Sequence, residues 1–213
     1  MAPGQFGREE AFGQTGALSP VDRLGIWLSA RRVRKSAGSL AGRRIGDIGC
    51  GYHATLVRQL LPSVASAVVV DLALAPDLLT KQRVTAHEGH LPEVLDSVPD
   101  ASLDVTLCIS VLEHLWEPEV VLRHLRRITA PGGVVLINVP SWRGKFFLEL
   151  SAFRFSLSPA EEMQDHKAYY DPRDLWPLLI RAGFLPREVA CRRYKFGLNT
   201  FAVCRVSEGS HRG

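Results

Sequence analysis

Gly46-Asp47-Ile48-Gly49-Cys50-Gly51 ends a short apolar strand pattern. A second apolar run, residues 67–70, ends in Asp71, about twenty residues beyond Gly51. A strand, a glycine turn, a helix and a second strand that ends in a carboxylate form the layout of a nucleoside-binding βαβ unit. The glycines let the backbone approach a ligand closely because they carry no Cβ atom. Asp71 is placed to accept hydrogen bonds from both ribose hydroxyls, so the pattern predicts a nucleoside site.

The composition is that of an ordinary globular protein. The chain has 213 residues, of which 46% are hydrophobic and 23% charged, enough for one domain with a sizeable core. No apolar run reaches the roughly 18 residues of a membrane-spanning helix, and the N-terminus lacks the order of a secretion signal. We therefore expect a cytoplasmic protein. The four cysteines form no C-x-x-C pair and the seven histidines show no metal-ligand spacing, so reduced thiols and no metal site are expected.

Strand and helix patterns alternate from residue 43 onward and predict one α/β domain over residues 19–206. The expected fold is Rossmann-like, with helices on both faces of a seven-stranded, mostly parallel sheet and a C-terminal antiparallel hairpin. The strand patterns cover residues 43–48, 67–71, 83–86, 105–109, 134–139, 188–194 and 200–206. An N-terminal helix is expected at 19–37 and an inserted lid at 141–168, while residues 1–18 and 207–213 are predicted to be flexible tails.

Four motifs in order carry a family resemblance. They are residues 47–53, Asp71, residues 104–115 with the run Ser-Val-Leu-Glu-His-Leu at their end, and residues 125–133, which end in Pro-Gly-Gly. With these motifs the chain resembles the class I S-adenosylmethionine-dependent methyltransferases of the type 11 group, from about residue 46 to residue 206. The resemblance implies the strand order 3-2-1-4-5-7-6 and S-adenosylmethionine as the cofactor.

The resemblance also implies a cofactor site. Gly49 and Gly51 would bring backbone amides close to the methionine moiety, Asp47 would organise its amino group, and Asp71 would bind the ribose. Adenine would lie beside the end of the third strand. The full set of implied cofactor residues is Asp47, Gly49, Cys50, Gly51, Asp71, Leu72, Gly89, His90, Leu91, Ile109 and Ser110.

Three positions depart from the family pattern. His53 stands in place of the third glycine, so a more open turn is expected there. Gly46 stands where a larger apolar residue is usual, and His90 stands where relatives commonly carry an acid that contacts adenine. A nicotinamide cofactor is a weaker alternative, because Asp71 would repel a ribose 2′-phosphate and Ala54 interrupts the G-x-G-x-x-G order.

Methyl transfer needs a general base only when the acceptor arrives protonated, as a hydroxyl does. The candidates are His166, which is our first choice, Tyr169 with its neighbour Tyr170, and His114. Each has a structural alternative: His166 as a surface histidine, His114 as part of the turn after the fourth strand, and the tyrosines as core or pocket wall.

The acceptor class is constrained by two features. Residues 110–113 read Ser-Val-Leu-Glu rather than the Asn/Asp-Pro-Pro-aromatic tetrad found in enzymes that methylate nucleobase amines, so no DNA partner is expected. The lid insert is rich in phenylalanine and leucine, which indicates an apolar or ring-bearing acceptor, packing of the lid onto the domain, or a membrane-contact surface. We expect methylation of an oxygen on a small sugar, lipid-linked or secondary-metabolite scaffold.

Other functions remain open at the level of sequence. The net charge of +4 comes from basic clusters near residues 31–44 and 192–195, which would suit an RNA or protein methyltransferase. The departures at His53 and His90 would suit a cofactor-binding subunit without activity. The oligomeric state is not indicated.

Overall fold

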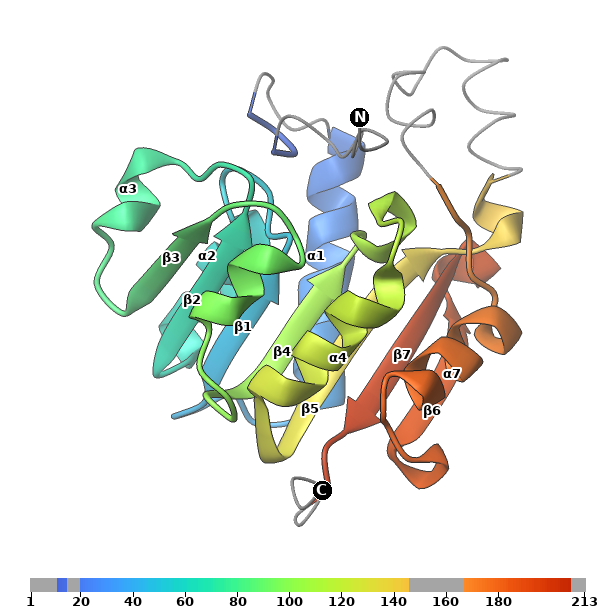
Figure 1. Cartoon of the computed structure of the whole chain (residues 1–213). Helices are drawn as coiled ribbons and strands as arrows, with labels where there is room; N and C mark the ends of the chain where they lie inside the picture. Colours follow the sequence, from blue (N-terminus) through green and yellow to red (C-terminus); the bar gives the residue numbers. More distant parts are fainter. Residues whose placement is uncertain (1–10, 15–19, 146–166, 208–213) are drawn as a thin grey trace, which may run out of the picture.

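The computed structural model describes residues 11–14, 20–145 and 167–207, which form a seven-stranded sheet with helices on both faces (Figure 1). The strands are β1 Arg44–Ile48, β2 Ser66–Asp71, β3 Val84–Glu88, β4 Leu103–Ile109, β5 Thr129–Pro140, β6 Val189–Tyr194 and β7 Asn199–Arg205. The helices are α1 Pro20–Ala37, α2 Thr55–Leu60, α3 Pro76–Leu79, α4 Pro118–Ile128 and α7 Pro172–Arg181. Short 3₁₀ turns are η1 Leu61–Ser63, η2 Glu93–Ser97, η3 Leu112–His114, η4 Pro186–Glu188 and η5 Lys195–Gly197.

The strand order is β3-β2-β1-β4-β5-β7-β6, which confirms the expected fold. The strands β3, β2, β1, β4 and β5 pair in parallel, whereas β7 pairs antiparallel with both β5 and β6. All five parallel strands therefore end at the same edge of the sheet. Loops that follow them share this edge, where open α/β sheets bind their ligands.

Each face of the sheet has its own hydrophobic core. Leu122 and Leu125 of α4 and Leu175 of α7 are buried on one face. Val33 of α1 and Val57 of α2 are buried on the other. Among the described residues, no helix is both long and apolar enough to span a membrane.

The start of β5 differs from its prediction. The Pro-Gly-Gly run 131–133 was expected to separate α4 from a strand at 134–139, but Thr129 already pairs with Leu103. The next pair is Val105 with Val134, so residues 130–133 form an irregularity within the strand. Gly133 permits this, because a Cβ atom there would lie 2.7 Å from the carbonyl oxygen of Ala130.

Candidate functional site

The glycine turn after β1 lies at the shared strand edge and is tightly enclosed. Gly49 and Gly51 have φ angles of 74° and 73°, in the left-handed region that glycine adopts without strain. A Cβ atom on Gly49 would lie 2.3 Å from Cγ2 of Val111, the residue that follows the tip of β4. The amide of Gly49 donates to the carbonyl oxygen of Val70 at 2.8 Å, which joins the turn to β2. A third residue of this segment, Ala54, also has a left-handed backbone (φ 44°). It follows directly on His53, the residue that replaces the third glycine of the family motif.

The carboxylate of Asp71 points at the glycine turn. Its Oδ2 accepts a hydrogen bond of 2.7 Å from the amide of Gly51, and its Oδ1 accepts one of 2.8 Å from the amide of Leu72. A carboxylate offers about four acceptor positions, and these two bonds occupy two of them. The role of Asp71 in binding a ribose stays a prediction.

Asp47 contributes a second, deeply buried carboxyl group. Its side chain is 2% exposed, and its Oδ2 has no hydrogen-bond partner among the described residues. Burial, and to a lesser degree the charge of Asp71, raises the pKa of Asp47 to about 7. A buried carboxyl of this kind is stabilised in its ionised form by a cationic partner, which the amino group of a methionine moiety would provide.

Cys50 lies inside the same turn as a neutral thiol. Its amide donates to the carbonyl oxygen of Val70 at 3.2 Å. Burial, followed by the charges of Asp47 and Asp71, raises its thiol pKa well above the usual value. Cys50 therefore contributes its backbone and its volume to the site rather than a thiolate.

The tip of β4 is also strained. Ile109 ends the strand half-buried, and the exposed Ser110 follows with a left-handed φ of 59°. Its amide donates to the carbonyl oxygen of Asn138 in β5 at 2.8 Å. Strained residues of this type cluster at functional sites.

Asn138 was missed by the sequence analysis. Its side chain is 1% exposed, and neither amide atom has a hydrogen-bond partner among the described residues. Because Asp47 pairs with Leu107 and Asn138 pairs with Ile109, alternation places Asp47 and Asn138 on the same face of the sheet. The signal available in the sequence was one amide within the apolar run 134–139.

The three residues implied for adenine lie at the end of β3. The amide of Gly89 donates to the carbonyl oxygen of Asp71 at 3.0 Å, which brings this loop to the end of β2. Gly89 and the exposed His90 line an open hollow at the edge of the sheet, together with Glu88 and Ser97. Leu91 instead packs against the core.

Residues 11–14, part of the segment predicted as a tail, lie against the glycine turn. Ala11 is buried, and the carbonyl oxygen of Phe12 accepts a hydrogen bond of 2.9 Å from the amide of Tyr52. A Cβ atom on Gly51 would lie 3.1 Å from the same oxygen. Residues 11–14 therefore form one wall of the turn.

The backbone after residue 166 is held against the ends of β4 and β5. The amides of Lys167 and Ala168 donate to the carbonyl oxygen of Glu113 at 2.7 and 3.3 Å, which holds the end of the segment predicted as a lid against η3. Tyr169 (8% exposed) follows this contact in sequence, and His114 is half-buried in η3. His166 lies outside the described residues.

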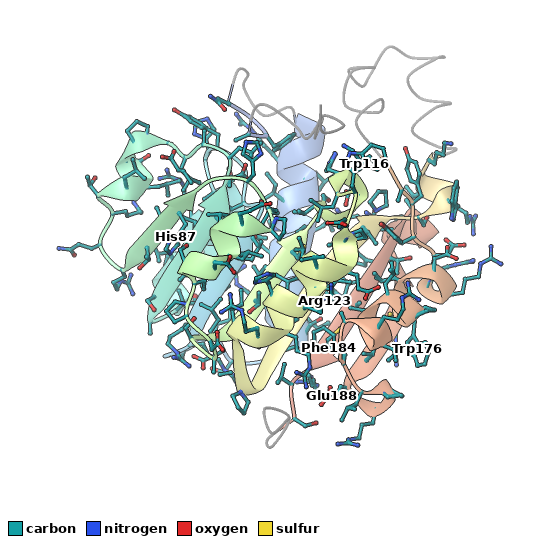
Figure 2. The ribbon with its side chains drawn as sticks, in the orientation of Figure 1. His87, Trp116, Arg123, Trp176, Phe184 and Glu188 are labelled. Carbon is teal, nitrogen blue, oxygen red and sulfur yellow. The ribbon has the colours of Figure 1, made fainter. Side chains whose placement is uncertain are left out.

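Exposed tryptophans border this end of the sheet. The ring centroid of Trp142 lies 5.6 Å from that of Tyr169, with the ammonium group of Lys145 5.5 Å from the Tyr169 ring. Trp116 is 71% exposed just before α4 (Figure 2), and the ammonium group of Lys167 lies 5.1 Å from its ring. In the described part of the chain, no group of three or more His, Cys, Asp or Glu side chains could hold a metal ion.

Comparison with known proteins agrees with this geometry. The sequence model of a methyltransferase-domain family matches residues 25–189. A Mycolicibacterium smegmatis protein named "Probable S-adenosylmethionine-dependent methyltransferase" is 29% identical over 165 residues, which are 74% of this chain and 59% of that protein. A ubiquinone biosynthesis O-methyltransferase of Aeromonas salmonicida is 27% identical over 186 residues, which are 80% of this chain and 75% of that protein.

A solved structure shows the same fold. The SAM-dependent methyltransferase from Archaeoglobus fulgidus superposes with a TM-score of 0.60 at 17% identity, over 84% of this chain and 94% of that chain. The matched family region contains the glycine turn, Asp71, the tip of β4 and α7. The chain therefore belongs to the methyltransferase-domain family and is an S-adenosylmethionine-dependent methyltransferase.

Proposed function

We propose that the enzyme methylates an oxygen atom of a small-molecule acceptor that carries a ring or an apolar body. The observation that carries this proposal is the aromatic border at the ends of β4 and β5, formed by Trp116, Trp142 and Tyr169. These side chains adjoin the strand edge that holds the glycine turn. Similarity to proteins named as ubiquinone biosynthesis O-methyltransferases supports oxygen as the acceptor atom.

The residues at the strand edge fit S-adenosylmethionine. Gly49 and Gly51 let Val111 and Phe12 pack close to the turn. Asp71 lies beside the turn as an acceptor for ribose hydroxyls, and the Oδ2 of Asp47, which has no hydrogen-bond partner among the described residues, suits a cationic amino group. When bound, this cofactor supplies a methyl group that its positive sulfur already activates. The protein then contributes mainly alignment of the acceptor, which can lower a barrier by about 7–11 kcal/mol.

A hydroxyl acceptor must also lose a proton. Tyr170 does not suit this role, because burial, followed by the charge of Glu113, raises its pKa to about 12. A group that still holds its proton at neutral pH cannot accept another. We propose His166 as the base, with His114 and Tyr169 as groups that border the acceptor.

A labelled-methyl transfer assay tests the proposal. Purified protein would be incubated with S-adenosylmethionine labelled in its methyl group and with matched acceptors that present a hydroxyl, an amine or a thiol on the same aromatic or lipid-like scaffold. We expect label on the hydroxyl compounds and none with Asp71→Ala. The matched control Asp100→Ala removes an exposed carboxylate that pairs with Arg127 and should retain activity. Label only on amines, thiols, RNA or protein would contradict the proposal.

A further inference from the structure

The turn η5 between β6 and β7 exposes a phenylalanine in an unfavourable backbone conformation. Phe196 is 100% exposed. Lys195, Phe196 and Gly197 have successive φ angles of 48°, 58° and 84°, and such values are genuine outliers for bulky residues. The strained backbone costs free energy, and the fully exposed ring contributes no stabilisation by burial. Backbone strain of this kind points to a role in function.

The same turn is firmly attached to the domain. The hydroxyl of Ser141 donates to the carbonyl oxygen of Gly197 at 2.7 Å. The amide of Ser141 donates to the carbonyl oxygen of Leu198 at 3.0 Å. On the other side, the hydroxyl of Tyr194 donates to the carbonyl oxygen of Leu28 in α1 at 2.9 Å. Phe196 therefore projects from a fixed support between α1 and the end of β5.

Apolar and basic side chains lie on both sides of this support. Leu24 and Trp27 of α1 are 56% and 50% exposed, and Trp142 is 49% exposed. The guanidinium of Arg143 lies beside Gly197. The side chain of Arg193 is 54% exposed, and its guanidinium lies 3.8 Å from the carboxylate of Asp171. We define the Phe196 patch as Leu24, Trp27, Trp142, Arg143, Arg193 and Phe196.

We propose that the Phe196 patch binds the surface of an anionic lipid bilayer. Exposed Phe, Trp and Leu side chains favour the boundary between headgroups and acyl chains, and arginines next to them attract lipid phosphates. Stacking on single-stranded nucleic acid suits the patch less well, because two of its rings already carry the protein's own cations. Arg31 lies 5.9 Å from the Trp27 ring and Lys145 lies 5.7 Å from the Trp142 ring.

Docking through this patch would bring the ends of β4 and β5, with Trp142 and Tyr169, close to the membrane. Ser141, which binds the turn, follows directly on β5, and Trp142 contacts Tyr169. An acceptor dissolved in the bilayer would then reach the site without crossing water. The binding of lipid itself does not depend on the proposed function.

Vesicle co-sedimentation tests the proposal. The full chain would be mixed with vesicles of phosphatidylcholine alone and with vesicles that also contain phosphatidylglycerol. We expect binding to the anionic vesicles that weakens with salt. Phe196→Asn should reduce the partition coefficient roughly tenfold or more, and this variant should fold because Asn tolerates a left-handed backbone. Arg143→Ala with Arg193→Ala should remove the preference for anionic vesicles.

The matched control is Leu79→Asn, which removes an exposed leucine (51%) on α3, outside the patch. It should bind vesicles as the wild type does. The proposal would be overturned if the wild-type protein bound neither vesicle type. It would also be overturned if Phe196→Asn and Leu79→Asn reduced vesicle binding equally. Binding of single-stranded RNA that depends on Phe196, without vesicle binding, would overturn it in favour of a nucleic-acid partner. Calorimetry with S-adenosylmethionine on each variant keeps a failure of the methyl-transfer assay separate from a failure of lipid binding.

Discussion

The carboxyl group of Asp47 should destabilise the fold as the pH rises. In the unfolded chain the group titrates near 3.8, whereas its pKa in the folded chain is about 7. Between these values the folded state binds more protons than the unfolded state, so the free energy of unfolding falls with increasing pH. We predict that from about pH 5.5 to about pH 8 the wild type loses roughly 2 kcal/mol more stability than Asp47→Asn. Urea unfolding at both pH values measures this difference.

The same variant separates stability from binding. Asp47→Asn keeps the size of the side chain but cannot carry the charge that would face a cationic amino group. We expect calorimetry to show much weaker S-adenosylmethionine binding by a protein that is more stable at about pH 8. Parallel stability curves for the two proteins would show that Asp47 ionises in the folded state as it does in water.

At Asn138, too, we predict that a substitution raises stability and lowers activity. Its buried amide lacks hydrogen-bond partners among the described residues, and an unsatisfied buried polar group costs about 1–3 kcal/mol. Asn138→Leu should therefore raise the free energy of unfolding by about that amount and lower kcat/KM at least tenfold if the amide binds cofactor or acceptor. Urea unfolding and steady-state kinetics on one preparation measure both effects. A stable variant with full activity would show that Asn138 has no functional contact.

At the scale of elements, the side chain of Leu103 in β4 fills the space beside Gly46 in β1. A Cβ atom on Gly46 would lie 2.4 Å from Cδ1 of Leu103, which is buried and fills the space that a larger residue would occupy. This explains the departure of Gly46 from the family pattern as a local exchange of volume between neighbouring strands.

A double-mutant cycle tests this exchange. Gly46→Ala should destabilise the protein by about 1–3 kcal/mol through overpacking, and Leu103→Ala by about 2–5 kcal/mol through the cavity it leaves. Because the added methyl group would enter that cavity, the double variant should be less destabilised than the sum by about 1 kcal/mol. Urea unfolding of the four proteins gives the coupling energy, and strict additivity would contradict the explanation.

Elements were predictable where local sequence determines them. Residues 67–71 and 105–109 were recognised as strands because uninterrupted apolar runs suit a strand covered on both faces. The start of β5 at Thr129 was not recognised, because its pairing with Leu103 precedes an irregularity at Pro-Gly-Gly. The exposure of Phe196 was equally hidden, since it depends on how α1 and Ser141 hold the hairpin.

At the scale of the whole molecule, the site was predictable only in part, because some of its residues come together through contacts between distant parts of the chain. The glycine turn and Asp71 belong to one βαβ unit, so their proximity follows from short-range sequence. Phe12 and Asn138 reach the site from distant parts of the chain, and no local pattern indicates that they meet there. Several elements therefore have to be folded before these residues come together.

This non-local construction couples cofactor binding to the stability of the entire domain. A ligand that binds only the folded state stabilises it by about 2.7 kcal/mol at a free concentration of one hundred times Kd. For a chain of this size, 1 kcal/mol raises Tm by about 2–4 °C, so S-adenosylmethionine should raise Tm by about 5–11 °C. Differential scanning fluorimetry should show this shift in wild type and in Asp100→Ala, and no shift in Asp71→Ala, whose Gly51 and Leu72 amides lose their acceptor. An equal shift in all three proteins would mean that the ligand binds away from the end of β2, because only contacts made there depend on the Asp71 carboxylate.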